Sequence, residues 1–187
     1  SMKAIIEGLL FASGDEGMTI KQISNIIEAS EDQVQSAIAE LKDDCRQDDR
    51  GLTIMQSHQV VHLTTKPEHS AYYKKMLDNP SPSRMSQAAL ETLAIITYKQ
   101  PITKTEVEEI RGVSSDRPIK TLLARSLIEE AGRKDSPGRP ILYRTSKEFL
   151  IYFGLTSLDE LPEISDLTED NLAEEADLFF EKIDIED

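Results

Sequence analysis

The chain of 187 residues has no tryptophan, one cysteine and three histidines, and only 5% of its residues are aromatic. A single cysteine, Cys45, permits no internal disulfide and fits a reducing compartment. His58, His62 and His69 are too few and too scattered for a zinc site. We therefore expect no metal site, and we expect Cys45 to be a core or boundary residue.

Long apolar runs and phosphate-binding loops are also absent from the sequence. No run approaches the roughly 18 apolar residues of a membrane-spanning helix, and no signal peptide is recognisable. Neither a G-x-x-x-x-G-K-S/T loop nor a G-x-G-x-x-G turn after a strand occurs. We therefore expect a cytoplasmic chain with no membrane contact, no cofactor and no visible means to hydrolyse ATP.

Acidic residues outnumber basic ones, and most of the excess lies near the C-terminus. The formal net charge is −14. Residues 163–187 hold one basic and 11 acidic residues, a net charge of −10, whereas residues 81–162 sum to +1. A net negative charge opposes binding to nucleic acid, because the affinity of proteins for nucleic acid comes mainly from neutralising its phosphates.

The first part of the chain contains three amphipathic helix patterns followed by a hairpin pattern. Ser30 and Gln33 are typical of a capping box at the start of the third helix. The apolar runs 52–55 and 60–63 flank a short turn and predict two strands. Three helices followed by a β-hairpin is the element order of a winged helix.

The same pattern recurs 84 positions later without gaps, so that Thr19 falls on Thr103. In this second copy Ser86 predicts a helix N-cap, and Ser114 or Ser115 predicts the cap of the third helix. Residues 132–140 form a loop too long for a tight hairpin, which predicts a wing. A period of 84 is too long for a solenoid and indicates two copies of one domain. The predicted fold class is α+β, mainly α with small β-hairpins, arranged as tandem winged-helix domains.

These patterns predict four segments. They are an N-terminal winged helix over residues 2–79, a linker rich in proline and serine over 80–85, a C-terminal winged helix over 86–162 and an acidic tail over 163–187. Within the tail, one helical face holds Leu172, Ala176, Phe179, Phe180 and Ile183. This face predicts a short amphipathic helix, docked either on the chain itself or in a groove of a partner.

Four stretches carry a resemblance to a known family, and they lie at residues 86–96, 98–103, 110–113 and 137–143. Together they resemble the bacterial segregation and condensation protein B family, ScpB. The resemblance implies a non-enzymatic subunit of the SMC condensin complex that acts in chromosome condensation and segregation. It further implies a homodimer that binds the kleisin ScpA and, through it, SMC. The implied location is the cytoplasm, at the nucleoid, with mostly indirect and at most weak direct contact to DNA.

Some side chains near helix ends and in the wing offer rings or hydrogen-bonding groups that these structures do not require. We predict that they contact the partner: Tyr98, Lys99, Gln100, Arg111, Arg139 and Tyr143. Two alternatives stay open, because Tyr98 can be a core residue and Arg139 can brace the wing against the second helix. For the dimer interface we predict Ile5, Leu9 and Phe11. That prediction combines the resemblance with an apolar surplus on the first helix.

The alternative function is a winged-helix DNA-binding transcriptional regulator, because winged helices often place the third helix in the major groove. A basic patch in the second copy favours it, and comprises Arg117, Lys120, Arg125, Arg133, Lys134, Arg139 and Arg144. In the first copy the third helix instead presents acidic residues such as Glu31 and Asp32. Phosphate would repel that face, which argues against DNA reading there.

Overall fold

The computed structural model describes residues 1–76 and 85–183, apart from the side chains of Lys74, Lys182 and Ile183. The predicted linker therefore falls outside the described residues except for Met85. Contacts divide the described chain into two units, one of residues 1–76 and 154–160 and the other of residues 85–153 and 161–183. Residues 154–160, which the sequence assigned to the C-terminal winged helix, thus group with the first unit. The predicted segment boundaries stay predictions.

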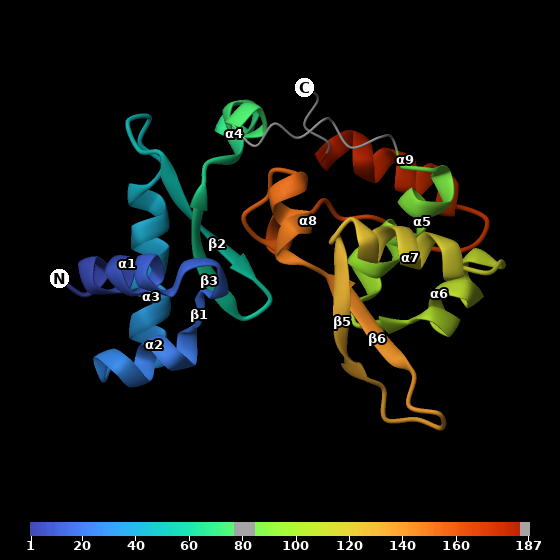
Figure 1. Cartoon of the computed structure of the whole chain (residues 1–187), viewed down its shortest axis with the longest axis horizontal. Coiled ribbons are helices and arrows are strands. Elements are labelled where there is room, and N and C mark those ends of the chain that lie inside the picture. Colours follow the sequence, from blue (N-terminus) through green and yellow to red (C-terminus); the bar gives the residue numbers. More distant parts are fainter. Residues whose placement is uncertain (77–84, 184–187) are drawn as a thin grey trace. The chain divides into compact units, whose positions relative to one another are not determined.

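The first unit has the element order of a winged helix (Figure 1). Its elements are α1 (Met2–Ser13), β1 (Met18–Thr19), α2 (Ile20–Ile27), α3 (Glu31–Asp44), β2 (Leu52–Ser57), β3 (Val60–Thr65) and α4 (Ser70–Met76). The strands form an antiparallel sheet in the order β1-β3-β2, with Met18 opposite Val61 and Ser57 opposite Val60. The helices and this sheet enclose a core of Ile6, Leu10, Ile23, Val34, Ile38, Leu41, Ile54 and Val61.

The second unit repeats this order and adds two helices. Its elements are α5 (Gln87–Lys99), β4 (Ile102–Thr103), α6 (Lys104–Arg111), α7 (Asp116–Ala124), β5 (Ile128–Arg133), β6 (Ile141–Thr145), α8 (Lys147–Tyr152) and α9 (Leu172–Ile183). Its sheet order, β4-β6-β5, corresponds to that of the first unit. An offset of 84 places β1 on β4 and α2 on α6 residue for residue. The prediction of an α+β tandem winged-helix fold is confirmed.

Helix caps explain why the helices begin where the sequence predicts. Ser30 Oγ accepts from the Gln33 N–H at 3.1 Å, and the Gln33 side chain accepts in return from the Ser30 N–H. Ser86 Oγ accepts from the Ala89 N–H at 3.2 Å. These bonds satisfy backbone donors that an α-helix leaves unpaired in its first turn.

Two local features differ from the sequence prediction. The strands β1 and β4 were not predicted, because two residues are too few to show an alternating pattern. Ser115 occupies the N-cap position of α7, but its side chain makes no capping bond. Its hydroxyl accepts instead from the Arg111 guanidinium at 3.0 Å. The Arg111 side chain thus takes the place of the backbone N–H donor that the cap would have paired.

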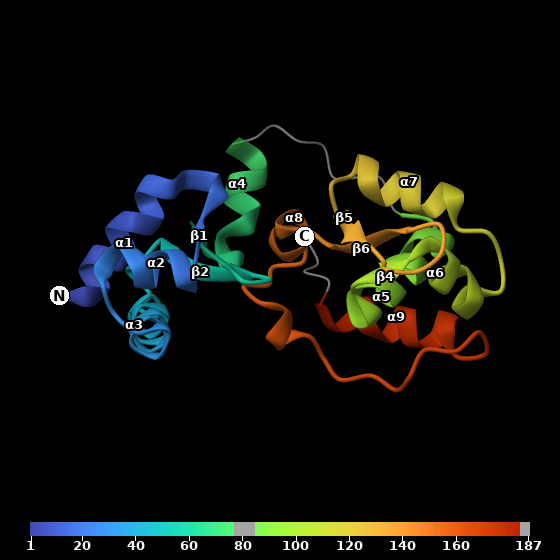
Figure 2. The same ribbon diagram turned by 90° about the horizontal axis from the view of Figure 1, so that it is seen from below.

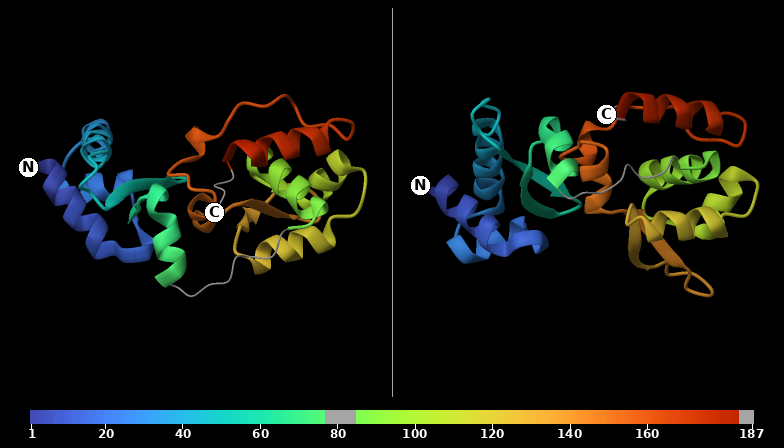
Figure 3. Two further views of the ribbon diagram at one scale, coloured as in Figure 1. Left: turned by 90° about the horizontal axis from the view of Figure 1, so that it is seen from above. Right: turned by 45° about the horizontal axis from the view of Figure 1, so that its top comes forward.

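Helix α5 is covered on two sides, by α7 and by α9 (Figures 2 and 3). All residues from Thr92 to Thr97 are buried. The two threonine hydroxyls stay satisfied by donating to backbone carbonyls one turn earlier, at 2.8 Å for Thr92 and 2.6 Å for Thr97. Among the described helices, none is both long and apolar enough to span a membrane.

Replacing the cap of α3 tests its contribution. We expect Ser30→Ala to lower the free energy of unfolding by about 1 kcal/mol, because the Gln33 N–H loses its acceptor. Ser36→Ala is the control, because Ser36 is exposed in the middle of the same helix, and we expect a change within about 0.5 kcal/mol. Urea unfolding followed by circular dichroism measures both, and equal effects would contradict the role of the cap.

Candidate partner-binding surfaces

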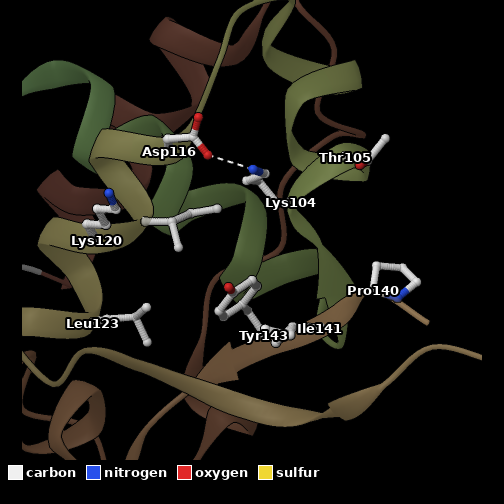
Figure 4. A pocket seen from close by; sticks show the side chains of 9 residues that line it. Lys104, Thr105, Asp116, Lys120, Leu123, Pro140, Ile141 and Tyr143 are labelled. Carbon is white, nitrogen blue, oxygen red and sulfur yellow. Dashed lines mark hydrogen bonds and ion pairs between the residues drawn. The ribbon is translucent and has the colours of Figure 1, made fainter. Parts of the chain in front are cut away.

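The second unit contains a hollow of about 350 Å³ between α6, α7 and the start of β6 (Figure 4). The residues that line it are Lys104, Thr105, Asp116, Ile119, Lys120, Leu123, Pro140, Ile141 and Tyr143. Helix α7 contributes the side chains on one side, and the chain entering β6 contributes those on the other. The hollow therefore lies where the third helix and the wing of this winged helix meet.

The lining is apolar at its base and charged at its rim. Ile119 and Tyr143 are buried, and Leu123 and Ile141 are half-buried beside them. At the rim, Lys104 Nζ donates to Asp116 Oδ1 at 2.6 Å (Figure 4). This bond raises the pKa of Lys104 and lowers the pKa of Asp116. Lys120 also lies at the rim, and its positive charge lowers the pKa of Asp116 further.

Tyr143 is one of the predicted partner-binding residues, and it lines this hollow. Burial raises the pKa of its phenol, with a smaller effect from the negative charge of Glu130. The hydroxyl therefore stays protonated and available as a hydrogen-bond donor at neutral pH. Tyr143 is fixed by the pairing of β6 with β4, in which it lies opposite Ile102.

Tyr98 and Lys99 are covered by the C-terminal part of the same unit. The Tyr98 hydroxyl donates to the Pro162 carbonyl, and its ring meets Phe179 of α9 edge-on at 5.1 Å. Burial, followed by the charge of Glu175, raises the pKa of Tyr98 to about 12. Lys99 Nζ lies 3.1 Å from Asp166 Oδ1.

Gln100 and Arg111 act as internal braces. Gln100 Oε1 accepts from the backbone N–H and the hydroxyl of Thr145, at 3.0 and 3.1 Å. The Arg111 side chain is only 7% exposed and lies 3.8 Å from the Glu91 carboxylate. One guanidinium nitrogen donates to Ser114 O and Ser115 Oγ, both at 3.0 Å. Gln100 therefore ties the end of α5 to β6, and Arg111 holds the loop between α6 and α7.

Arg139 lies exposed in the wing, with a positive φ of 41°. Its carbonyl accepts from Arg133 at 2.9 Å. The wing is tied to α6 by a different residue, because Lys134 Nζ lies 3.0 Å from Glu106 Oε1. That bond lowers the pKa of Glu106. The six predicted partner-binding residues thus do not form one surface, and Tyr143 and Arg139 lie apart from the group near Tyr98.

In the first unit, α1 presents apolar side chains to solvent. Ile5 is 55% exposed and Phe11 is 77% exposed, while Leu9 is half-buried. Gly8 lies between them, and apart from α1 itself no described atom is within 4 Å of the place a Cβ would take. A glycine in the middle of a helix costs about 0.5–1 kcal/mol relative to alanine. Nothing in the described part of the unit explains that cost.

Sequence reasoning missed Gly8 and the hollow beside Tyr143. A glycine among exposed apolar residues on a helical face was a usable signal for the first. The hollow had no such signal, because its walls come from three elements separated in sequence.

The described residues also contain no cluster of three or more His, Cys, Asp or Glu side chains that could hold a metal. Cys45 is buried, as predicted, and burial raises the pKa of its thiol.

These observations define a class of protein, namely a tandem winged-helix protein with an exposed apolar helix face in one unit and a hollow beside the wing in the other. The family model described as "Segregation and condensation complex subunit ScpB" matches residues 4–164. The chain therefore belongs to the ScpB family and is a subunit of the segregation and condensation complex. Its role in chromosome segregation and condensation follows from this membership, and a DNA-binding transcriptional regulator is not favoured.

Individual relatives agree with this assignment. Segregation and condensation protein B of Oceanobacillus iheyensis is 58% identical over 96% of this chain and 94% of the relative, and that of Geobacillus kaustophilus is 54% identical over 98% and 85%. Among solved structures, ScpB from Mycobacterium tuberculosis is 30% identical over 83% of this chain and 96% of that chain, with a TM-score of 0.40. A crystal structure of a dimer of an ScpB N-terminal domain complexed with an ScpA peptide is 46% identical over 40% of this chain and 91% of that chain, with a TM-score of 0.38.

The raised pKa of the Tyr98 phenol predicts how the free energy of unfolding changes at alkaline pH. Its pKa of about 12 lies above the ordinary value of 10. Between these values the unfolded phenol ionises while the folded one stays protonated, so the free energy of unfolding falls as pH rises through this window. Below pH 10 this effect is absent.

We expect Tyr98→Phe to remove that part of the pH dependence and to cost about 1 kcal/mol at neutral pH, because the bond to Pro162 is lost. Urea unfolding of both proteins at about pH 7, 9 and 11 gives the comparison, since all other titrating groups are shared. An identical loss of stability between pH 9 and 11 in the two proteins would show that Tyr98 does not carry the effect.

Proposed function

We propose that this chain acts as a homodimer that binds ScpA and reaches SMC through it, without catalysing a reaction. The observation that carries the proposal is the pair of open surfaces, namely the apolar face of α1 and the hollow between α6, α7 and β6. The ScpB–ScpA peptide complex of a relative supports the choice of partner. The place of action is the cytoplasm at the nucleoid, and contact with DNA is mostly indirect.

The α1 face suits a second copy of the chain. Ile5, Gly8 and Ala12 follow at intervals of three and four residues, so they lie along one line of the helix. Glycine and alanine at such positions let two helices approach closely, and Ile5 and Phe11 supply apolar area on either side. A second α1 lying across Gly8 would bury this exposed surface and offset the cost of the glycine.

Gly8→Glu tests the dimer. We expect the variant to be monomeric at about 10 µM, because a charged side chain would stand where the second helix must approach. The control is Ala39→Glu, since Ala39 is exposed on a different helix, α3, and it should leave the dimer intact. Light scattering coupled to size-exclusion chromatography measures both masses, and a dimeric Gly8→Glu protein would refute this interface.

The hollow suits a segment of ScpA that places an apolar side chain against Tyr143 and an acidic one near Lys120. The volume of about 350 Å³ accommodates a single large side chain. The lining holds two lysines, Lys104 and Lys120, and one carboxylate, Asp116, so it carries one net positive charge. The ScpA residues on either side of this apolar side chain would then lie at the rim, where charge contributes to the orientation and the association rate of the partner.

We expect Lys120→Glu to weaken binding of ScpA by about threefold to tenfold, because reversing a rim charge turns attraction into repulsion. Arg117→Glu is the matched control, because it makes the same charge change on the same helix at an exposed residue outside the lining. Isothermal titration calorimetry with full-length ScpA measures both affinities. Equal losses in the two variants would indicate a general charge effect instead of a site at the hollow.

A pull-down from cytosol tests the function as a whole. Recovery of ScpA together with SMC supports the proposal. Recovery of DNA alone, with micromolar binding to random duplex that weakens with salt, would favour the DNA-binding alternative. Substitution of Arg133, Lys134 and Arg139 would abolish that binding if the wing were responsible.

A further inference from the structure

Residues 154–160 belong to the first unit, although the chain reaches them only after passing through the second. The Gln56 N–H donates to the Thr156 carbonyl at 2.7 Å, and Gln56 forms a parallel β-bridge with Ser157. Gln56 lies in β2, which is at an edge of its sheet because the strand order is β1-β3-β2. Covering an edge strand satisfies backbone groups that have no neighbouring strand. Residues 154–160, here called the strap, therefore extend the sheet of the first unit at the end of β2.

Thr156 is the centre of these contacts. It is 6% exposed, and its N–H, carbonyl and hydroxyl are all bonded. The hydroxyl accepts from Lys42 Nζ at 2.9 Å and donates to Glu160 Oε1 at 2.7 Å, and the N–H donates to Glu160 Oε2 at 2.8 Å. Lys42 lies on α3, 114 positions earlier in the chain. Because an unpaired buried polar group costs free energy, this complete pairing indicates a specific contact.

The Thr156 hydroxyl lies between a cation and a carboxylate. The ammonium group of Lys42 can only donate and an ionised carboxylate can only accept, so the group between them must do both. Hydrogen bonds to charged groups are stronger than those between neutral groups. Valine has the shape of threonine without the hydroxyl, so it would remove this acceptor from Lys42. The attachment of the strap therefore depends on a single side chain.

Both ends of the strap continue directly into the second unit. Phe153, immediately before it, is 3% exposed and packs against Phe149, and Pro162, two residues after it, accepts from the Tyr98 hydroxyl. Gly154 begins the strap with a φ of 68°, a conformation that favours glycine. The chain therefore has little slack on either side of the strap.

Two domains joined only by a linker are expected to move relative to each other. The linker predicted at residues 80–85 would leave that freedom. We propose that the strap couples the two winged helices. While Thr156 is bonded to Lys42 and Gln56, the second unit moves with the first, because the chain joins them at three points along the sequence. Release of the strap leaves the linker as the only connection.

Thr156→Val tests the strap by hydrogen exchange of the full chain. We expect the Gln56 amide to exchange at least about tenfold faster, because the strap loses a buried bond to a charged group, while the amides of β3 keep their protection. Thr168→Val is the matched control, because Thr168 is exposed and lies outside the strap, and it should change neither. An unchanged rate at Gln56 would overturn the proposal. Loss of protection throughout the sheet would also overturn it, because residues 154–160 would then be needed for folding of the first unit.

Lys42→Met removes the donor from the other side of the same bond. We expect it to accelerate exchange at Gln56 as well, and the double variant with Thr156→Val to exchange no faster than Thr156→Val alone, because both changes break one contact. Lys21→Met is the control, since Lys21 is exposed on α2. Additive effects of the two substitutions would show that Lys42 and Thr156 act separately, which contradicts the strap as described.

Nuclear spin relaxation of backbone ¹⁵N measures the coupling itself. It gives the rotational correlation time of each unit within one sample, so the association state of the chain is the same for both. We expect equal values in the unaltered chain, and in Thr156→Val a shorter value for the second unit than for the first. Unequal values in the unaltered chain would overturn the proposal. Equal values in Thr156→Val, despite faster exchange at Gln56, would do so too.

Discussion

Helix α5 is apolar around most of its circumference, and such a helix must be covered from more than one side. Burial of every residue from Thr92 to Thr97 satisfies this requirement. The winged-helix elements α6, α7 and β6 cover part of α5, and α9 covers a further face. The acidic C-terminal segment is therefore tied into the second unit through its few apolar residues, although its composition alone would place it in solvent.

The corresponding helix of the first unit, α1, has no such cover within the described residues of its unit. Ile5 and Phe11 are exposed, and Gly8 leaves open space beside them. The two copies of the domain thus differ in how one helix face is completed. In the second copy a helix of the same chain completes it, and in the first copy we assign that role to a second copy of the chain. Under the proposed function, this difference lets one copy serve dimerisation and the other serve partner binding.

The chemistry of the partner surfaces is that of recognition. The hollow beside Tyr143, the proposed ScpA site, combines an apolar base with a charged rim of Lys104, Asp116 and Lys120. Lys134 holds the wing that borders this region by pairing with Glu106. A wing fixed in this way presents a preformed surface, and a preformed surface loses less conformational entropy when a partner binds.

The sequence by itself determined the features that depend on neighbours along the chain. Caps such as Ser30 with Gln33, the helix and hairpin patterns and the apolar face around Phe179 are local, and the repeat of 84 is the same set of local patterns found twice. Apart from the Ser115 cap and the two-residue strands β1 and β4, these patterns predicted their elements correctly. The tertiary structure alone decided what individual polar residues do. Tyr98, Gln100 and Arg111 looked alike as partner contacts, yet Tyr98 packs against α9, Gln100 bonds to β6 and Arg111 holds the loop between α6 and α7. Their roles depend on segments up to 81 positions away, between Tyr98 and Phe179, and no local pattern encodes which distant side chain arrives there.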